Sequence, residues 1–148
     1  MTLESASPPR GEGAPLAFEV YIGSFGGPSY GAWWDGERIV YESFEAQYER
    51  RKQASVAPSA DEWHCFWRTM DEIGVWEWRR WYGAAERFEP EDVIRDGTHW
   101  SLTLACVGLR VESSGDSAGP GAPDLDESSA FVRFCDAVSR LVGGCTFA

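Results

Sequence analysis

The sequence predicts an α+β domain in which an antiparallel sheet of about five strands carries two helices packed on one of its faces. Three observations predict this class. Alternating apolar and polar residues indicate half-buried strands, and apolar residues at helical spacing indicate two amphipathic helices. Short turn motifs join the strands as hairpins rather than crossovers. The expected element order is β-β-β-α-β-β-α.

The chain has 148 residues, which suits one domain of ordinary size. We expect residues 1–15 to form a flexible tail, because they are rich in Ser, Pro, Gly and Glu, and residues 16–148 to form the domain. The tail lacks the pattern of a secretory signal, and no apolar run approaches the roughly 20 residues of a membrane span. Four cysteines without a C-x-x-C pair then predict a reduced, cytoplasmic protein.

The domain begins with three predicted strands. LAFEVYIG alternates apolar and polar residues, and YGAWW-DG-ERIVYE has the pattern of a hairpin. Asp35-Gly36 is a favoured pair for a two-residue type I′ turn, because both central residues need a positive φ. That turn predicts Trp34 opposite Glu37, with Trp33 and Trp34 on opposite faces of the sheet.

Residues 60–73 are predicted to form the first helix. Ser59-Ala60-Asp61-Glu62 is a capping box, in which the Ser hydroxyl and the Glu carboxylate each accept from the other residue's backbone N–H. Gly74 suits the left-handed residue after the helix. One apolar stripe follows the cap: Trp63, Phe66, Trp67, Met70 and Ile73.

The segment after Gly74 has no single pattern. VWEWRRWYG fits either a short extended piece or one more helical turn. AAERFEPEDVIRDG predicts a loop, because Pro90 breaks any helix there. Glu89, Glu91 and Asp92 in this loop are predicted to be solvated charges.

A second hairpin and a second helix end the domain. HWSLTLACVGLRVESSG predicts a turn at Val107-Gly108, which pairs Leu104 with Val111. SSGDSAGPGAPD predicts a mobile loop. The second helix is predicted to end at Gly143-Gly144, and its apolar stripe comprises Phe131, Phe134, Cys135, Val138 and Leu141.

Three stretches together resemble a family of small bacterial proteins. These are VWEWRRWY, then DGTHWSLTL, then VESSG with a Pro-bearing loop and the final helix. Members of that family have a Trp-x-Trp-like segment before a D-G-T-x-W strand. The resemblance covers residues 60–142 and implies a bacterial protein. It implies no activity, so no catalytic or binding residue carries over from it.

Composition excludes several kinds of partner. The net charge is −11, from 24 acidic and 13 basic residues, and the single lysine is Lys52. Nucleic acid and anionic membranes are poor partners, because binding to phosphates needs clustered Lys and Arg. An acidic surface can bind a basic protein. The alternative is that the charge only keeps the protein soluble.

The sequence predicts no catalytic residue, no metal site and no cofactor. The two histidines are His64 and His99, and adjacent helical residues such as His64 and Cys65 do not face each other. His99 could meet Cys65 only through the tertiary fold. Asp96 with the histidines and a cysteine lacks the spacing of known zinc sites.

The tryptophans are the remaining candidates for a binding surface. The core can account for Trp63, Trp67 and Trp100, whereas the segment after Gly74 has more aromatic surface than one core face can use. Its arginines can stack on indole faces. The candidate binding residues are therefore Trp33, Trp34, Trp76, Trp78, Arg79, Arg80 and Trp81.

Three functions are compatible with these candidates. The first is a non-enzymatic cytosolic module that binds a basic protein, as an acidic inhibitor or an immunity-type protein does. The second is a small-ligand-binding protein or enzyme with a pocket lined by Trp33 or Trp34 and the Trp76–Trp81 segment. The third is a homo-oligomer that buries the extra indoles in its own interface.

Overall fold

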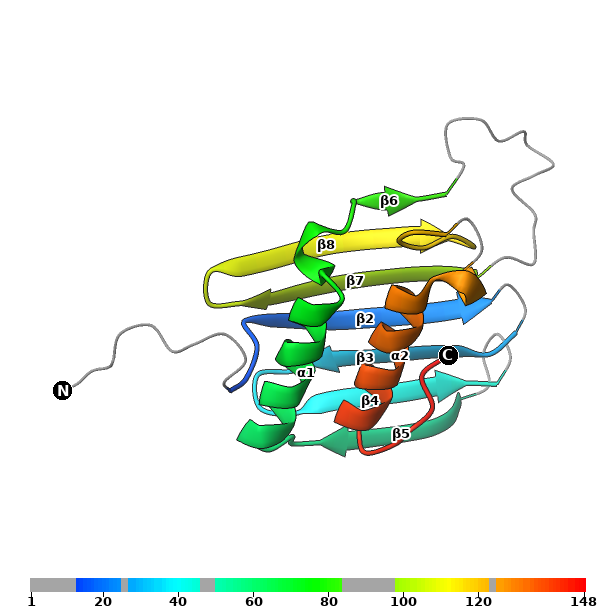
Figure 1. The fold of residues 1–148 in the computed structure, drawn as a ribbon. Coiled ribbons are helices and arrows are strands. Elements are labelled where there is room, and N and C mark those ends of the chain that lie inside the picture. The colour runs from blue at the N-terminus through cyan, green and yellow to red at the C-terminus, as the bar shows by residue number, and fades with distance from the viewer. Residues whose placement is uncertain (1–12, 25–26, 46–49, 84–97, 123–124) are drawn as a thin grey trace.

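The computed structural model describes residues 13–24, 27–45, 50–83, 98–122 and 125–148. Within these ranges, two helices and a seven-stranded sheet make up the fold (Figure 1). The strands are β2 (Ala17–Ser24), β3 (Ser29–Trp34), β4 (Ile39–Phe44), β5 (Arg50–Val56), β6 (Trp81–Tyr82), β7 (Thr98–Cys106) and β8 (Leu109–Asp116). The helices are α1 (Ala60–Glu72) and α2 (Ser129–Leu141), with 3₁₀ turns η1 (Val75–Glu77) and η4 (Leu125–Glu127).

The sheet is mixed, with strand order β5-β4-β3-β2-β7-β8-β6. Neighbouring strands are antiparallel except β6, which runs parallel to β8. The predicted α+β class is confirmed. The prediction of about five strands, all antiparallel, is wrong. All five predicted strands form, and β5 and β6 lie at the two edges as additional strands.

The residue patterns of β5 and β6 explain why these two strands were not predicted from the sequence. β5 reads RRKQASV, so most of it is polar, as suits an edge strand that faces water. β6 is only two residues long and pairs with β8, more than thirty positions further along the chain. Neither strand has the alternation on which the prediction relied.

The hairpin between β3 and β4 turns one residue later than predicted. Trp34 pairs with Ile39, and the Asp35 N–H donates to the Arg38 carbonyl. The Asp35 carboxylate accepts from the backbone N–H groups of Arg38 and Glu37, at 2.8 and 2.9 Å. These hydrogen bonds lower the pKa of the Asp35 carboxyl, and the bond from Arg38 has the larger effect. They also stabilise the turn at its later position. The predicted Trp34–Glu37 pairing is wrong. Moving the turn by one residue moves each pairing partner by two residues, so every side chain stays on its predicted face of the sheet.

The hairpin between β7 and β8 has the predicted register. Leu104 pairs with Val111, and Gly108 adopts a φ of 83° in the turn. The predicted loop of residues 113–124 begins too early, because β8 continues to Asp116. Ser113 is buried in that extension, and its hydroxyl donates to the Arg79 carbonyl at 2.5 Å. A polar sequence therefore forms strand here because it has a specific backbone partner.

Both helices begin at serine caps. The predicted capping box of α1 is present, with Ser59 Oγ accepting from Glu62 N at 3.1 Å and Glu62 Oε1 accepting from Ser59 N at 2.8 Å. Gly74 has the predicted left-handed conformation, with a φ of 69°. In α2 the Ser128 hydroxyl accepts from Phe131 N and donates to the Pro120 carbonyl. The cap of α2 thus also holds the preceding loop.

Aromatic side chains connect both helices to the sheet. Phe18 of β2 contacts Trp63 and Phe66 of α1, while Trp100 of β7 contacts Phe131 of α2. Figure 1 shows α1 and α2 side by side on the viewer's side of the sheet. The C-terminal residue pair Thr146-Phe147 fills the space beside α2, where Tyr41 donates to the Thr146 carbonyl. Phe147 packs on Tyr30 and Phe134.

Candidate functional site

The sheet has two different faces. Phe18, Val20 and Ile22 of β2 are buried and point towards the helices, whereas Glu19 and Tyr21 point the other way and are exposed. No helix in the described ranges lies against this second face. We call it the open face and define it by Glu19, Tyr21, Gly31, Trp33 and Trp81, together with the residues that pair with them across the sheet.

Trp33 and Trp34 lie on opposite faces, as predicted. Trp33 is on the open face, 37% exposed, between Glu19 of β2 and Val40 of β4. Trp34 packs edge-on against Trp63 of α1, with ring centroids 5.7 Å apart. Only Trp33 of this pair is therefore available to a partner on the open face.

Trp76 and Trp78 are mainly structural. Trp76 stacks on Trp67 of α1 with a centroid distance of 5.9 Å, and its indole N–H donates to Asp71 Oδ1 at 2.8 Å. Trp78 is only 9% exposed and contacts Trp100, and its indole N–H donates to the Ile73 carbonyl. The η1 turn brings both indoles back onto the core.

Trp81 is the exposed indole of its segment. It is 40% exposed and pairs with Ser114 on the open face, whereas the next residue, Tyr82, is buried and stacks on Trp100. The Trp81 ring lies against Gly83, where a Cβ would come within 3.0 Å of the indole. Gly83 has a φ of 147°, which glycine adopts readily, and the absence of a Cβ leaves room for the ring.

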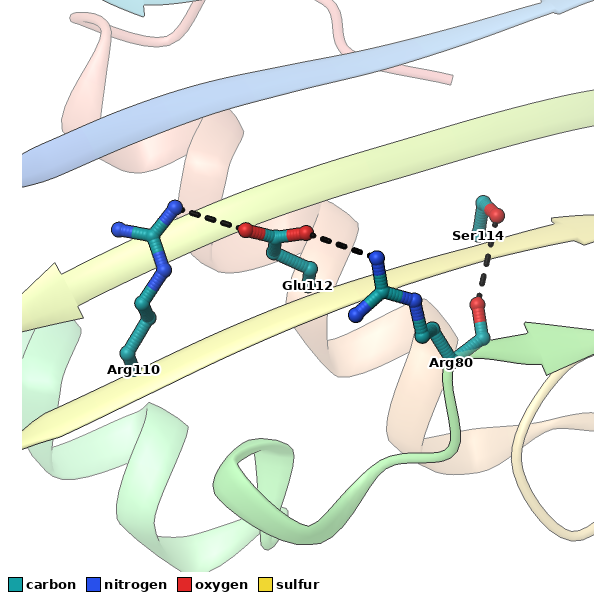
Figure 2. A network of polar contacts seen from close by, with 4 residues as sticks. All are labelled: Arg80, Arg110, Glu112 and Ser114. Carbon is teal, nitrogen blue, oxygen red and sulfur yellow. Dashed lines mark hydrogen bonds and ion pairs between the residues drawn. The ribbon is translucent and has the colours of Figure 1, made fainter.

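The two arginines do not have the predicted indole partners. The Arg79 guanidinium lies over the Tyr82 ring, 4.6 Å from its centroid. Arg80 reaches Glu112 at 3.4 Å, and Arg110 reaches the other oxygen of Glu112 at 2.7 Å (Figure 2). The Arg80 carbonyl also accepts from the backbone N–H of Ser114. The Arg80 contacts thus join β6 to β8, whereas the Arg79 guanidinium packs on a ring of its own segment, and both side chains stay exposed.

The charge network around Glu112 lies at the edge of the sheet. The hydrogen bond from Arg110 and its positive charge, with a further contribution from Arg80, lower the pKa of the Glu112 carboxyl. Arg80 and Arg110 remain more than half exposed, so water screens these pairs strongly. The network itself has a net charge of +1, because two guanidinium groups share one carboxylate.

The strand order separates the two exposed indoles. β3, which carries Trp33, is four steps from β6, which carries Trp81, in the order of the sheet. That is about 19 Å at the usual spacing between strands. Trp33 and the Trp76–Trp81 segment therefore do not line one small-molecule pocket.

The open face contains a hollow that no sequence pattern predicted. It has a volume of about 260 Å³ and lies over Gly31. Gly31 is the central member of a row across three strands, with Tyr21 on one side and Glu42 on the other. A glycine in the middle of a strand is the signal that could have found it, because such a residue often marks a close approach or a missing side chain. The hollow is lined by Glu19, Val20, Tyr21, Ser29, Tyr30, Gly31, Trp33, Glu42, Phe44 and Ser101.

Two larger cavities lie on the helical side. One of about 450 Å³ lies between α1 and α2 and includes the exposed thiol of Cys65. The other, of about 390 Å³, lies beside the C-terminal residues and includes Cys135. Burial, and secondarily the charge of Asp136, raise the pKa of the Cys135 thiol to about 12, so this group is an inert core residue.

The other titratable groups considered from the sequence are dispersed. His64 Nε2 is 2.9 Å from Arg68 Nη2, and His99 Nδ1 is 3.4 Å from Asp116 Oδ1. Within the residues that the structure describes, no group of three or more His, Cys, Asp or Glu side chains is arranged to hold a metal ion. The predicted loop with Pro90, Glu89, Glu91 and Asp92, and Asp96 after it, lie outside the described residues.

We found no significant match to this chain among protein-family models, curated proteins or solved structures. The resemblance to small bacterial proteins with a D-G-T-x-W strand therefore stays a prediction. In the described part of the chain, no helix is long and apolar enough to cross a membrane.

Proposed function

We propose that this chain is a non-enzymatic, acidic module that binds a basic protein partner through the open face of its sheet. The observation that carries the proposal is the position of three large aromatic side chains. Tyr21, Trp33 and Trp81 are exposed on a face that no described helix covers. Tyr and Trp are enriched in the cores of protein interfaces, where they supply most of the binding energy.

The charge of the chain supports a basic partner. A net charge of −11 attracts a basic protein over a distance of about one Debye length and increases the rate of encounter. The same charge repels a second copy of this chain. The homo-oligomer alternative is therefore less well supported than binding to a basic protein.

The small-ligand alternative is also less well supported. Its pocket would need Trp33 or Trp34 beside the Trp76–Trp81 segment. The strand order keeps Trp33 apart from Trp81, and Trp34 packs against Trp63 of α1. The hollow beside Trp33, at about 260 Å³, is smaller than the ~300–1,000 Å³ of typical small-molecule sites, and the two larger cavities on the helical side are not lined by tryptophan. An acidic inhibitor or an immunity-type protein, acting in the cytoplasm, is the form of this function that we favour.

A comparative pull-down tests the proposed function. The wild-type chain is immobilised and exposed to lysate at roughly 50 mM and roughly 500 mM salt, beside a Trp33→Ala/Trp81→Ala variant and a Val132→Ala control. Val132 is an exposed apolar residue on α2. We expect a basic protein that the wild type and the control retain at low salt, and that the double variant loses. Retention of the same proteins by all three chains would contradict the proposal.

A further inference from the structure

We propose that the hollow over Gly31 binds the guanidinium group of an arginine side chain, presented by the basic partner; this inference rests on the proposed function and specifies its recognition chemistry. The hollow has a floor formed by strand backbone, aromatic walls and two carboxylates. Those are the three elements that recognise a planar cation.

The floor exists because one side chain is missing from the open face. Tyr21 pairs with Gly31, and Gly31 pairs with Glu42, so the row has side chains only at its ends. A Cβ built at Gly31 would lie 3.8 Å from the Val20 carbonyl oxygen and 4.0 Å from the Tyr21 ring. These are ordinary contacts, so the backbone does not require glycine here. The open space, rather than the backbone conformation, distinguishes this position.

The aromatic walls are already in place. Trp33 lies two residues from Gly31 along β3, and Tyr21 lies beside it on β2, 45% exposed. The Tyr21 ring extends along its own strand over Gly23, where a Cβ would clash with the phenol oxygen. Tyr21 therefore covers Gly23 and leaves the space over Gly31 open.

The charge of the hollow is negative. Glu19 pairs with Trp33 on one side of Gly31, and Glu42 pairs with Gly31 on the other, so the carboxylates lie diagonally across the hollow. Glu42 accepts a hydrogen bond from Gln53 Nε2 at 3.0 Å. Among the described residues no ion pair neutralises either carboxylate, and the residues that line the hollow include no Lys, Arg or His.

Arginine fits this arrangement better than the other candidate occupants. Its flat guanidinium can lie against a ring and donate to a carboxylate at the same time, whereas an ammonium is a strongly hydrated point charge. A volume of about 260 Å³ suits one side chain better than a whole metabolite. An anionic ligand would be repelled by Glu19 and Glu42.

Short peptides test the inference without knowledge of the partner. The probe is acetyl-Gly-Arg-Gly-amide, titrated at constant ionic strength while tryptophan fluorescence and the Trp33 indole N–H resonance are followed. Matched peptides replace Arg with citrulline, which is neutral and similar in shape, or with Lys. We expect the citrulline peptide to bind at least about tenfold more weakly, and the Lys peptide to bind measurably more weakly than the Arg peptide. Equal binding of all three peptides would overturn the inference.

Filling the hollow provides the matched variant. Gly31→Val places a β-branched side chain over the floor, where the Cβ has room and the strand favours that residue type. We expect this variant to keep or raise the melting temperature and to lose binding of the Arg peptide. Val132→Ala, an exposed position on α2 away from the open face, should bind like the wild type. Undiminished binding by a folded Gly31→Val chain would overturn the inference.

The outcomes separate the inference from the proposed function. If the partner binds the wild type and Gly31→Val alike, while Trp33→Ala/Trp81→Ala loses it, the open face binds a partner but the hollow takes no arginine. If the Arg peptide binds in the hollow but the lysate yields no partner that depends on the open face, the recognition chemistry holds and the proposed function fails.

Discussion

At the scale of the residue, Trp78 and Trp81 show how little sequence separation says about environment. Trp78 is packed against Trp100, Phe131 and Phe134, whereas Trp81 lies on the open face. The η1 turn and the parallel pairing of β6 with β8 cause this difference. The sequence placed both in one candidate site, because the pairing that separates them is not local.

Alanine substitutions should divide the indoles by role. We expect Trp67→Ala to lower the free energy of unfolding by about 3–5 kcal/mol, because it leaves a cavity beside Trp63 and Trp76. Trp33→Ala should cost about 1 kcal/mol, since it loses mainly cross-strand contacts. Urea unfolding followed by circular dichroism measures both. A cost for Trp33→Ala as large as that for Trp67→Ala would show that Trp33 is a core residue.

Cys135 should make stability fall in alkali. Burial raises its pKa in the folded state to about 12, from an ordinary value of 9.0. An unfolded thiol loses its proton above about pH 9, while the folded one keeps it, so the stabilising contribution is present below pH 9 and is lost progressively as the pH rises to about 12.

The measurement is urea unfolding of the wild type and of Cys135→Ala at a series of pH values. We expect the stability difference between the two chains to shrink by about 1.4 kcal/mol per pH unit above pH 9. A difference independent of pH would contradict the raised pKa.

At the scale of the element, the two serine caps should differ in strength. Ser59 is exposed, whereas Ser128 is buried and also donates to the Pro120 carbonyl at 2.6 Å. We expect Ser59→Ala to cost about 1 kcal/mol and Ser128→Ala about 2–3 kcal/mol, because the second change also removes the hydrogen-bond donor of the part-buried Pro120 carbonyl. Thermal unfolding of the two variants compares them. Equal costs would contradict the second role of Ser128.

Local signals predicted the helices and one hairpin well. A cap and an apolar stripe are contained in one stretch of chain, so α1 and α2 follow from Ser59, Gly74 and the helical spacing. The β3–β4 turn failed because the Asp35 side chain binds two backbone N–H groups and moves the turn by one residue. The hollow at Gly31 needed the register of three strands, which no single stretch of sequence contains.

At the scale of the whole molecule, the charge of −11 should keep the isolated chain monomeric. Light scattering at high micromolar concentration measures this. We expect the monomer mass for both the wild type and Trp33→Ala at low salt, where the repulsion is least screened. A dimer in the wild type that Trp33→Ala abolishes would instead support the homo-oligomer and contradict the preference for a basic partner.

The division of the molecule into a helical side and an open face is the basis of the proposed function. The most direct test is a nuclear magnetic resonance map of the full chain with the arginine-containing peptide. We expect the resonances of Tyr21, Gly31, Glu42 and the Trp33 indole to shift together, while those of α1 and α2 stay fixed. Shifts concentrated on the helices, or no shift with the peptide in large excess, would contradict binding through the open face.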